Sequence, residues 1–211
     1  MADWDADSTR LRQNLTQVLR DIRDSAQRRD TPTIEAARKW QADTMAGLEV
    51  PDPTFIGRFR GEDGVENIRV WVGRAEGVPP AGVAKQLQEF EQRLQEVVAA
   101  LDQSCPVGQE LDADGLAAII DVCAWAHSEW VRIHPFANGN GRTARLWANF
   151  LLMRYGLPPA IWLRPRPDGG YAAAGARAMA GDWKPTAVVF RKMLLAVLAA
   201  GRRRTPPSAG P

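Results

Sequence analysis

The sequence predicts a mostly α-helical protein with one small β-hairpin, built around a single core. Apolar residues recur at helical spacing along most of the chain. Only one run, NIRVWVG at 67–73, is short and rich in β-branched residues, as a strand would be. A length of 211 residues with 45% apolar residues is sufficient for one domain with a sizeable core.

Two helices are predicted near the N-terminus. Residues 8–29 place five apolar side chains on one helical face: Leu11, Leu15, Val18, Leu19 and Ile22. A second helix is expected over 32–47, because Pro32 suits a first turn and Gly47 suits a helix end. Residues 49–64 contain several prolines and glycines, so they are expected to form a loop.

The run at 67–73 is interpreted as one strand of the hairpin, with turns at Gly73 and Gly77. Helical spacing returns after Pro80. Further helices are expected in this order: through Leu101, over 112–131, from Asn140 to just before Gly156, and over 171–181 and 184–200. The tail, 201–211, is expected to be disordered.

Composition excludes several classes of protein. The net charge is only +2 and the folded part has no dense basic stripe, so a nucleic-acid partner is not predicted. The longest apolar run, 193–201, is too short to span a bilayer, and the acidic N-terminus is unlike a signal peptide. Cys105 and Cys123 form no motif and are expected to be reduced. We therefore expect a cytoplasmic protein with no membrane partner.

The segment VRIHPFANGNGRTAR, residues 131–145, contains one of the two histidines of the chain. Because Pro135 disfavours a helical conformation at His134, the preceding helix should end there and leave the imidazole on a loop. Ile133 and Phe136 are apolar and should anchor this loop to the core. A histidine with an ordinary pKa near 6.5 suits the role of general base.

Gly139, Asn140 and Gly141 lead into the next helix. Glycines allow unusual backbone angles, and the N–H groups at a helix N-terminus form an anion site. Arg142 and Arg145 share one helical face, and each guanidinium can hold two phosphate oxygens. A base, an anion site and two arginines indicate a polyphosphate site that transfers a phosphate-containing group to a hydroxyl.

Taken in order, these residues resemble the signature of the Fic family, HPF-x-[D/E]-G-N-G-R-x-x-R. The match covers His134-Pro135-Phe136, Gly139-Asn140-Gly141-Arg142 and Arg145. Residues 57–60 and 171–185 also resemble family segments, and the similarity covers about 33–195. The resemblance implies the Fic-type helical fold with a hairpin flap. We expect this domain over 31–200, after a helical extension over 1–30.

The resemblance also implies an activity: transfer of AMP from ATP to a Ser, Thr or Tyr hydroxyl of a target protein. His134 would be the catalytic base, assisted by Arg142. The donor would be held by Gly139, Asn140, Gly141, Arg142 and Arg145, with Phe136 anchoring the loop and Tyr171 beside the donor's base. The flap would bind the target by strand addition, through Ile68, Val70, Trp71 and Val72.

One position departs from the family signature. Asn138 stands where the family has the Asp or Glu that holds Mg²⁺ on the nucleotide phosphates. An amide oxygen is neutral and is a weaker ligand for this hard cation. Three alternatives follow: weakened Mg²⁺ binding, a different phosphate-containing donor, or a nucleotide-binding module without turnover. Direct phosphoryl transfer is a close alternative to AMP transfer, since the motif does not separate the two.

The sequence departs from many family members in a second way, because it lacks an obvious inhibitory motif. Many family members carry an inhibitory helix, [S/T]-x-x-x-E-[G/N], whose glutamate pairs with the arginine equivalent to Arg145. Here only Thr31 has a glutamate four residues on, Glu35, and Ala36 follows it instead of Gly or Asn. We interpret this match as accidental. Either a separate small protein supplies the inhibitor, as in toxin–antitoxin pairs, or this control is absent.

Three residues outside the motif are interpreted structurally. His127 has apolar neighbours and is expected to be a structural residue, with a second catalytic histidine as the alternative. Arg58 and Arg60 are expected to form internal ion pairs, with phosphate binding as the alternative. A zinc site is not predicted, because two histidines and two unpatterned cysteines are too few ligands.

Overall fold

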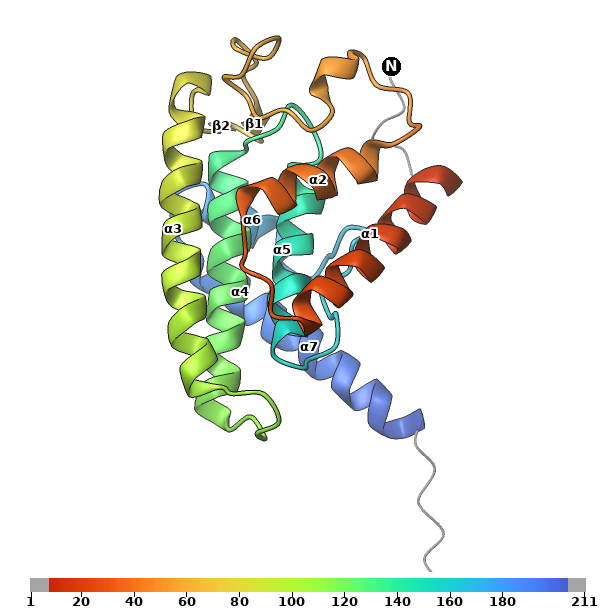
Figure 1. Ribbon diagram of the computed structural model, residues 1–211, viewed down its shortest axis with the longest axis vertical. Helices are drawn as coiled ribbons and strands as arrows, with labels where there is room; N and C mark the ends of the chain where they lie inside the picture. Colours follow the sequence, from red (N-terminus) through yellow and green to blue (C-terminus); the bar gives the residue numbers. More distant parts are fainter. Residues whose placement is uncertain (1–7, 205–211) are drawn as a thin grey trace, which may run out of the picture.

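Two helices, α4 (Ala113–Ile133) and α5 (Asn140–Arg154), lie side by side at the centre of the computed structural model, which describes residues 8–204 (Figure 1). The other long helices surround them: α1 (Thr9–Gln27), α2 (Ile34–Met45), α3 (Pro80–Ser104) and α7 (Lys184–Arg204). α1 and α2 pack on α5, whereas α3 and α7 pack on α4. The predicted mostly helical fold is confirmed.

Helix starts follow from capping side chains. Ser8, Thr33 and Asp112 each accept a hydrogen bond from the backbone N–H three residues on, which satisfies one donor at the first turn of α1, α2 and α4. Because Thr33 caps α2, this helix begins at Ile34, and Pro32 lies before the cap. The prediction that Pro32 occupies the first helical turn is therefore wrong.

The centre of the bundle is an aromatic cluster that fixes α5 against its neighbours. Trp147 of α5 contacts Trp40, Phe90 and Trp130, with ring centroids 4.7, 5.7 and 5.9 Å away. These contacts are edge-on, an arrangement that adds about 0.5–1.5 kcal/mol per pair to apolar burial. Every residue of α5 except Gly141 is buried. The first turn of α5 is therefore held rigidly by the core.

The hairpin is present but shorter than predicted. β1 (Trp71–Val72) and β2 (Ala75–Glu76) pair antiparallel, with Trp71 opposite Glu76 and Val72 opposite Ala75. Gly73 supplies the positive φ of +61° that the tight turn needs. Residues 67–70 are not in the strand, because the Ile68 N–H bonds back to the Val65 carbonyl in a turn. The predicted strand over 67–73 is thus too long.

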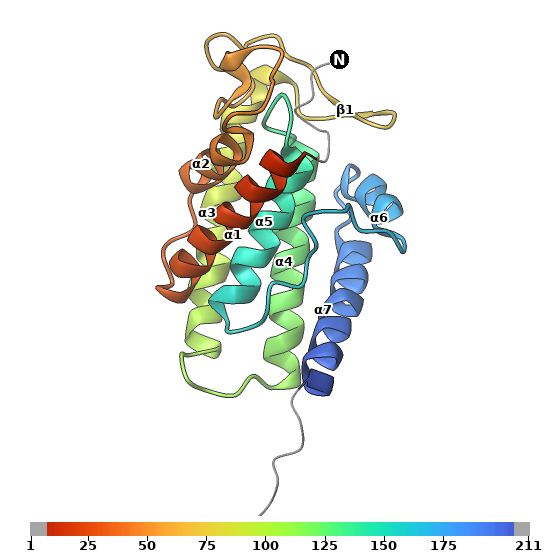
Figure 2. The ribbon, with the colours of Figure 1, turned by 90° about the vertical axis from the view of Figure 1, so that its right-hand side faces the viewer.

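The C-terminal part completes one side of the bundle. A short helix, α6 (Tyr171–Ala178), precedes α7, and Figure 2 shows α6 on the side toward which the hairpin projects. A 3₁₀ turn, η1 (Pro53–Phe55), lies in the predicted loop. α7 continues to Arg204, so 201–204 are helical and not disordered as expected, while 205–211 lie outside the described residues. Within residues 8–204 no helix combines the length and the apolar character that crossing a membrane requires.

Candidate active site

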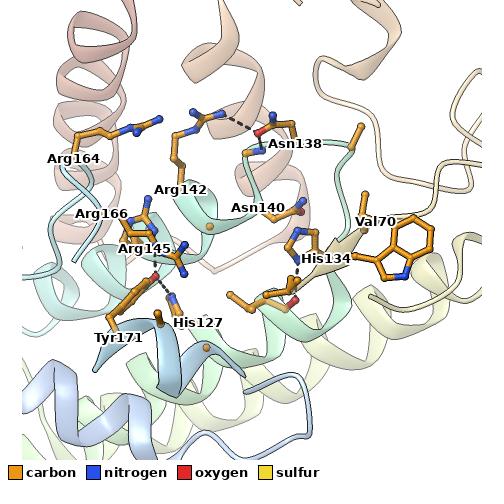
Figure 3. Close-up of a pocket in the computed structure, with 18 of the residues that line it drawn as sticks. Val70, His127, His134, Asn138, Asn140, Arg142, Arg145, Arg164, Arg166 and Tyr171 are labelled. Atoms are coloured by element: carbon orange, nitrogen blue, oxygen red, sulfur yellow. Dashed lines mark hydrogen bonds between the residues drawn. The ribbon is translucent and has the colours of Figure 1, made fainter. Parts of the chain in front are cut away.

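A cavity of about 660 Å³ opens where the α4–α5 loop, β1, α6 and the segment before α6 meet (Figure 3). Its size suits a nucleotide-sized ligand. Five arginines line it: Arg69, Arg142, Arg145, Arg164 and Arg166. No Asp or Glu is among its lining residues in the described part of the chain. Guanidinium groups around a cavity favour an anionic ligand.

His134 ends α4, as expected from Pro135. Its backbone N–H donates to the Trp130 carbonyl, and its backbone is left-handed, with φ of 54°. The Nδ1 atom lies 3.0 Å from the Val131 carbonyl, which can only accept, so Nδ1 carries the proton. The lone pair is then on Nε2. Burial lowers the pKa of His134 below its ordinary value, so the imidazole is neutral near pH 7 and can accept a proton.

The rest of the loop is fastened to the core. Phe136 is fully buried, and its ring centroid lies 4.9 Å from that of Phe59, so this side chain anchors the loop without lining the cavity. The Asn140 side chain binds both main-chain groups of Phe136, accepting from its N–H and donating to its carbonyl at 2.8 Å each. Asn140 therefore shapes the loop with its side chain.

The loop ends on an anion site at the start of α5. Gly139 caps the helix with φ of +88°, and a Cβ there would lie 3.0 Å from Cε of Met45. Only glycine suits this combination of positive φ and close packing. By helix geometry, the first N–H groups of α5 have no intrahelical acceptor. They lie at the cavity, where Asn140, Gly141 and Arg142 are lining residues.

Asn138 does not provide a favourable Mg²⁺ ligand. Its Oδ1 accepts hydrogen bonds from the Gly139 N–H and from Nη2 of Arg142, the latter at 3.2 Å. The oxygen is thus neutral and already used by two donors, whereas Mg²⁺ prefers carboxylates. In residues 8–204 no cluster of three or more His, Cys, Asp or Glu side chains could hold a metal ion. The side chains at this position therefore do not fit the family's metal site.

Arg145 belongs to a buried hydrogen-bond network on the wall of the cavity that is formed by α6. Its Nη1 donates to the Tyr171 hydroxyl at 3.2 Å, and its Nη2 donates to the Leu163 carbonyl at 3.2 Å. The same hydroxyl lies 2.6 Å from Nε2 of His127. Burial, with the charges of Arg145 and Arg166, lowers the pKa of His127 to about 3, so it is neutral. His127 lines the cavity and fixes Tyr171, which in turn orients Arg145.

The flap covers the cavity beside His134. Of the four residues predicted to bind a target, Val70, Trp71 and Val72 line the cavity, whereas Ile68 is not among the lining residues. Trp71 is 54% exposed, and Arg69 lies over its ring at 5.2 Å. β2 pairs with only one edge of β1 in this two-stranded sheet. Within the described residues, the other edge of β1 therefore has no strand partner.

Sequence reasoning missed four residues at this site: Arg69, Arg164, Arg166 and Gln41. Arg164 and Arg166 line the cavity from the segment before α6. Gln41 of α2 donates to the Asn138 carbonyl at 3.3 Å and accepts from the Gly57 N–H at 2.6 Å. Arg60 is buried and donates to backbone carbonyls, which corrects the expected ion pair. No sequence spacing links these residues to the motif.

The interpretation of Arg58 also needs correction. Arg58 lies at the surface, and its Nη1 donates to the Asp63 carbonyl at 2.6 Å, a main-chain acceptor instead of the expected carboxylate. It is not among the residues that line the cavity. Arg58 therefore has no part in the site.

The sequence of this chain is similar to those of known proteins. The Fic/DOC family model matches residues 31–152. The protein adenylyltransferase fic-1 of Caenorhabditis elegans is 37% identical over 134 residues, covering 64% of this chain and 22% of that protein. The protein adenylyltransferase Fic of Drosophila grimshawi is 36% identical over 110 residues, covering 52% of this chain and 18% of that protein. The chain thus matches about a fifth of the length of these relatives.

Solved structures share the fold. A structure of Fic-1 from C. elegans superposes with a TM-score of 0.66 at 24% identity, covering 95% of this chain and 55% of the other. A Fic domain containing signaling protein from Bacteroides thetaiotaomicron gives a TM-score of 0.61 at 16% identity, covering 93% and 74%. At these identities the likeness concerns the fold alone.

Proposed function

The chain belongs to the Fic/DOC family, and we propose that it is a protein adenylyltransferase that moves AMP from ATP to a hydroxyl side chain of a target protein. The observation that carries the proposal is the neutral His134 imidazole, which lies between the anion site of α5 and the edge of β1. This arrangement provides a base between a phosphate-binding surface and a surface suited to an extended peptide.

The proposed reaction needs one proton transfer and one displacement at phosphorus. Nε2 of His134 takes the proton of the target hydroxyl, whose oxygen forms a bond to the α-phosphorus of ATP. The bond from that phosphorus to the α,β-bridging oxygen breaks, and pyrophosphate leaves. Arg142, Arg145 and the N–H groups of α5 offset the negative charge of the phosphates, and Tyr171 borders the donor.

No step in this proposal passes through Mg²⁺, because Asn138 is a poor ligand for it. Use of the ion with reduced affinity stays a prediction. A different phosphate-containing donor, phosphoryl transfer, and nucleotide binding without turnover stay predictions as well. Separate labels on the α- and γ-phosphates of ATP distinguish AMP transfer from phosphoryl transfer. Neither label is transferred if the protein uses a different donor or binds the nucleotide without turnover.

Partners are proposed from the flap and from the inhibitory motif. A Ser, Thr or Tyr hydroxyl on an extended segment would reach His134 when that segment pairs with β1. A separate small inhibitory protein, as in toxin–antitoxin pairs, is proposed because Glu35 pairs with Arg38 at 2.9 Å on α2 and is not part of the cavity lining. A cytoplasmic location and the lack of a nucleic-acid partner also stay predictions.

The test uses purified protein, a lysate as the source of targets, and ATP labelled at either the α- or the γ-phosphate. Transfer of the α label that is lost in His134→Ala would support AMP transfer. Transfer of the γ label alone would establish a phosphotransferase instead. If neither label is transferred while ATP still binds in a titration, the domain is a binding module or uses another donor.

A further inference from the structure

We propose that Arg60 is a positioning residue that holds the base His134 and the target-binding flap in one fixed arrangement. This inference rests on the proposed function for the roles of His134 and β1. Arg60 lies in the loop between α2 and the hairpin, outside the Fic motif. Its side chain is 1% exposed, although arginine is rarely buried to this extent.

One side of the Arg60 guanidinium binds the end of α4. Nε donates to the His134 carbonyl at 2.7 Å, and Nη2 donates to the Ile133 carbonyl at 3.0 Å. The backbone N–H of Arg60 donates to the Pro135 carbonyl at 2.7 Å. The left-handed conformation of His134, with φ of 54°, is unfavourable for a residue with a Cβ. These bonds hold the backbone on both sides of that conformation.

The other side of the guanidinium binds the two ends of the flap. Nη1 donates to the Ile68 carbonyl at 3.1 Å, and Nη2 also donates to the Val78 carbonyl at 2.7 Å. Ile68 precedes β1 and Val78 follows β2, so the guanidinium closes the base of the hairpin. The hairpin itself has only two residues in each strand and needs such an anchor.

Arginine is specifically suited to this junction. Its planar group carries five N–H donors in a fixed fork, and four carbonyl oxygens accept from Arg60 here. A lysine ammonium has three donors at one point and could not reach all four acceptors. Burial lowers the pKa of Arg60 to about 10, so the group keeps its charge at neutral pH.

Direct packing joins the flap to the base as well. A Cβ on Gly77, the residue after β2, would lie 2.8 Å from Cβ of His134 and 3.3 Å from Nη2 of Arg60. Only a residue without a side chain allows this approach. The Gly77 N–H also donates to the Val70 carbonyl at 3.1 Å. Because of this close contact, a shift of the residues at the base of the flap would displace His134, and a shift of His134 would displace the base of the flap.

The test is an NMR titration of the two imidazoles against pH. Because the chain has only two histidines, their signals can be separated. In Arg60→Met we expect the pKa of His134 to rise toward its ordinary value, because a neighbouring cation is lost and water enters. His127, on the other wall, should not change. We expect kcat for labelling of the target to fall about 10- to 100-fold, with the Kd for ATP within about twofold.

Three further variants make the experiment decisive. Arg58→Met is the matched control, because Arg58 lies at the surface two residues away; it should leave both histidine signals and kcat unchanged. Arg60→Lys should recover only part of the rate, since charge alone does not restore the fork. Gly77→Ala should displace the His134 signal and lower kcat although the Arg60 side chain is retained in this variant.

The inference is overturned if Arg60→Met leaves the His134 titration and kcat unchanged, or if Arg58→Met has the same effect. If Arg60→Met unfolds, the native His127 signal is lost and this variant gives no answer. The Gly77→Ala variant then provides the test. An unchanged His134 signal in Gly77→Ala contradicts the proposal. A wild-type protein that transfers no label disproves the proposed activity instead. The NMR titrations would still test the positioning of His134.

Discussion

The α4–α5 loop and the β1–β2 hairpin border the same cavity but are stabilised in opposite ways. The loop is fixed by the core, with Phe136 fully buried and Asn140 bonded to both of its main-chain groups. The hairpin projects from the bundle, and Trp71 is more than half exposed. Besides its strand pairing and the exposed ion pair of Arg69 with Glu76 at 2.6 Å, the hairpin is held at its base by hydrogen bonds from Arg60 and by close packing at Gly77.

This difference separates two tasks. Positioning a base and phosphates requires an arrangement that changes little, and packing within a core provides it. Accepting an extended peptide requires exposed main-chain groups, and an unpaired strand edge provides them. The following changes test whether the buried loop controls the chemical step and the exposed flap controls target binding.

The largest effect is expected from His134→Ala. Removing the base should lower kcat for AMP transfer by about 10²- to 10⁴-fold, because proton transfer from the hydroxyl is lost. ATP binding, measured by titration calorimetry, should persist, since Arg142, Arg145 and the other groups proposed to bind the phosphates lie on α5. Full activity in this variant would show that the buried loop does not supply the base.

The buried His127 is expected to make the stability of the folded protein depend on pH. Its pKa in the folded protein is about 3, against 6.5 when unfolded, so the unfolded state binds more protons between these values. Stability is therefore lost as the pH falls below 6.5, by about 2 kcal/mol between pH 7 and pH 5.

The measurement is urea unfolding of His134→Ala at the two pH values, so that His127 is the remaining histidine. Adding His127→Gln should remove this part of the pH dependence. An equally steep loss of stability in the double variant would assign it to other groups.

Asn138→Asp should alter the metal dependence without moving the loop. A carboxylate at this position offers Mg²⁺ a charged ligand, so the Mg²⁺ concentration for half-maximal labelling should fall about tenfold. A titration of labelling rate against Mg²⁺ for both proteins measures this. An unchanged requirement would mean that the residue at position 138 does not contribute to metal binding.

The smallest effect is expected from Trp71→Ala in the flap. The KM for the target should rise about three- to tenfold, while kcat and the melting temperature stay nearly unchanged, because this side chain is exposed. Trp162→Ala is a matched control, since Trp162 is 53% exposed but does not line the cavity. A fall in kcat instead of a rise in KM would break the division between loop and flap.

The sequence by itself determined the order of the helices, the hairpin and the motif loop. These features depend on rules that act over a few residues: apolar spacing, the effect of Pro135 on His134, and the glycine at the start of α5. The same short range explains the errors. A cap at Thr33 was not anticipated, and a turn at Ile68 shortened the predicted strand.

Only the tertiary structure decided which distant groups complete the site. Arg60 bonds to the His134 carbonyl across 74 positions, and Tyr171 meets His127 across 44. No local pattern marks such pairs, because a buried polar group takes whichever partner the packing of several helices brings within hydrogen-bond distance. The motif therefore indicates the family and the proposed chemistry, while the packing of the bundle determines how the proposed base, the arginines and the flap are held together.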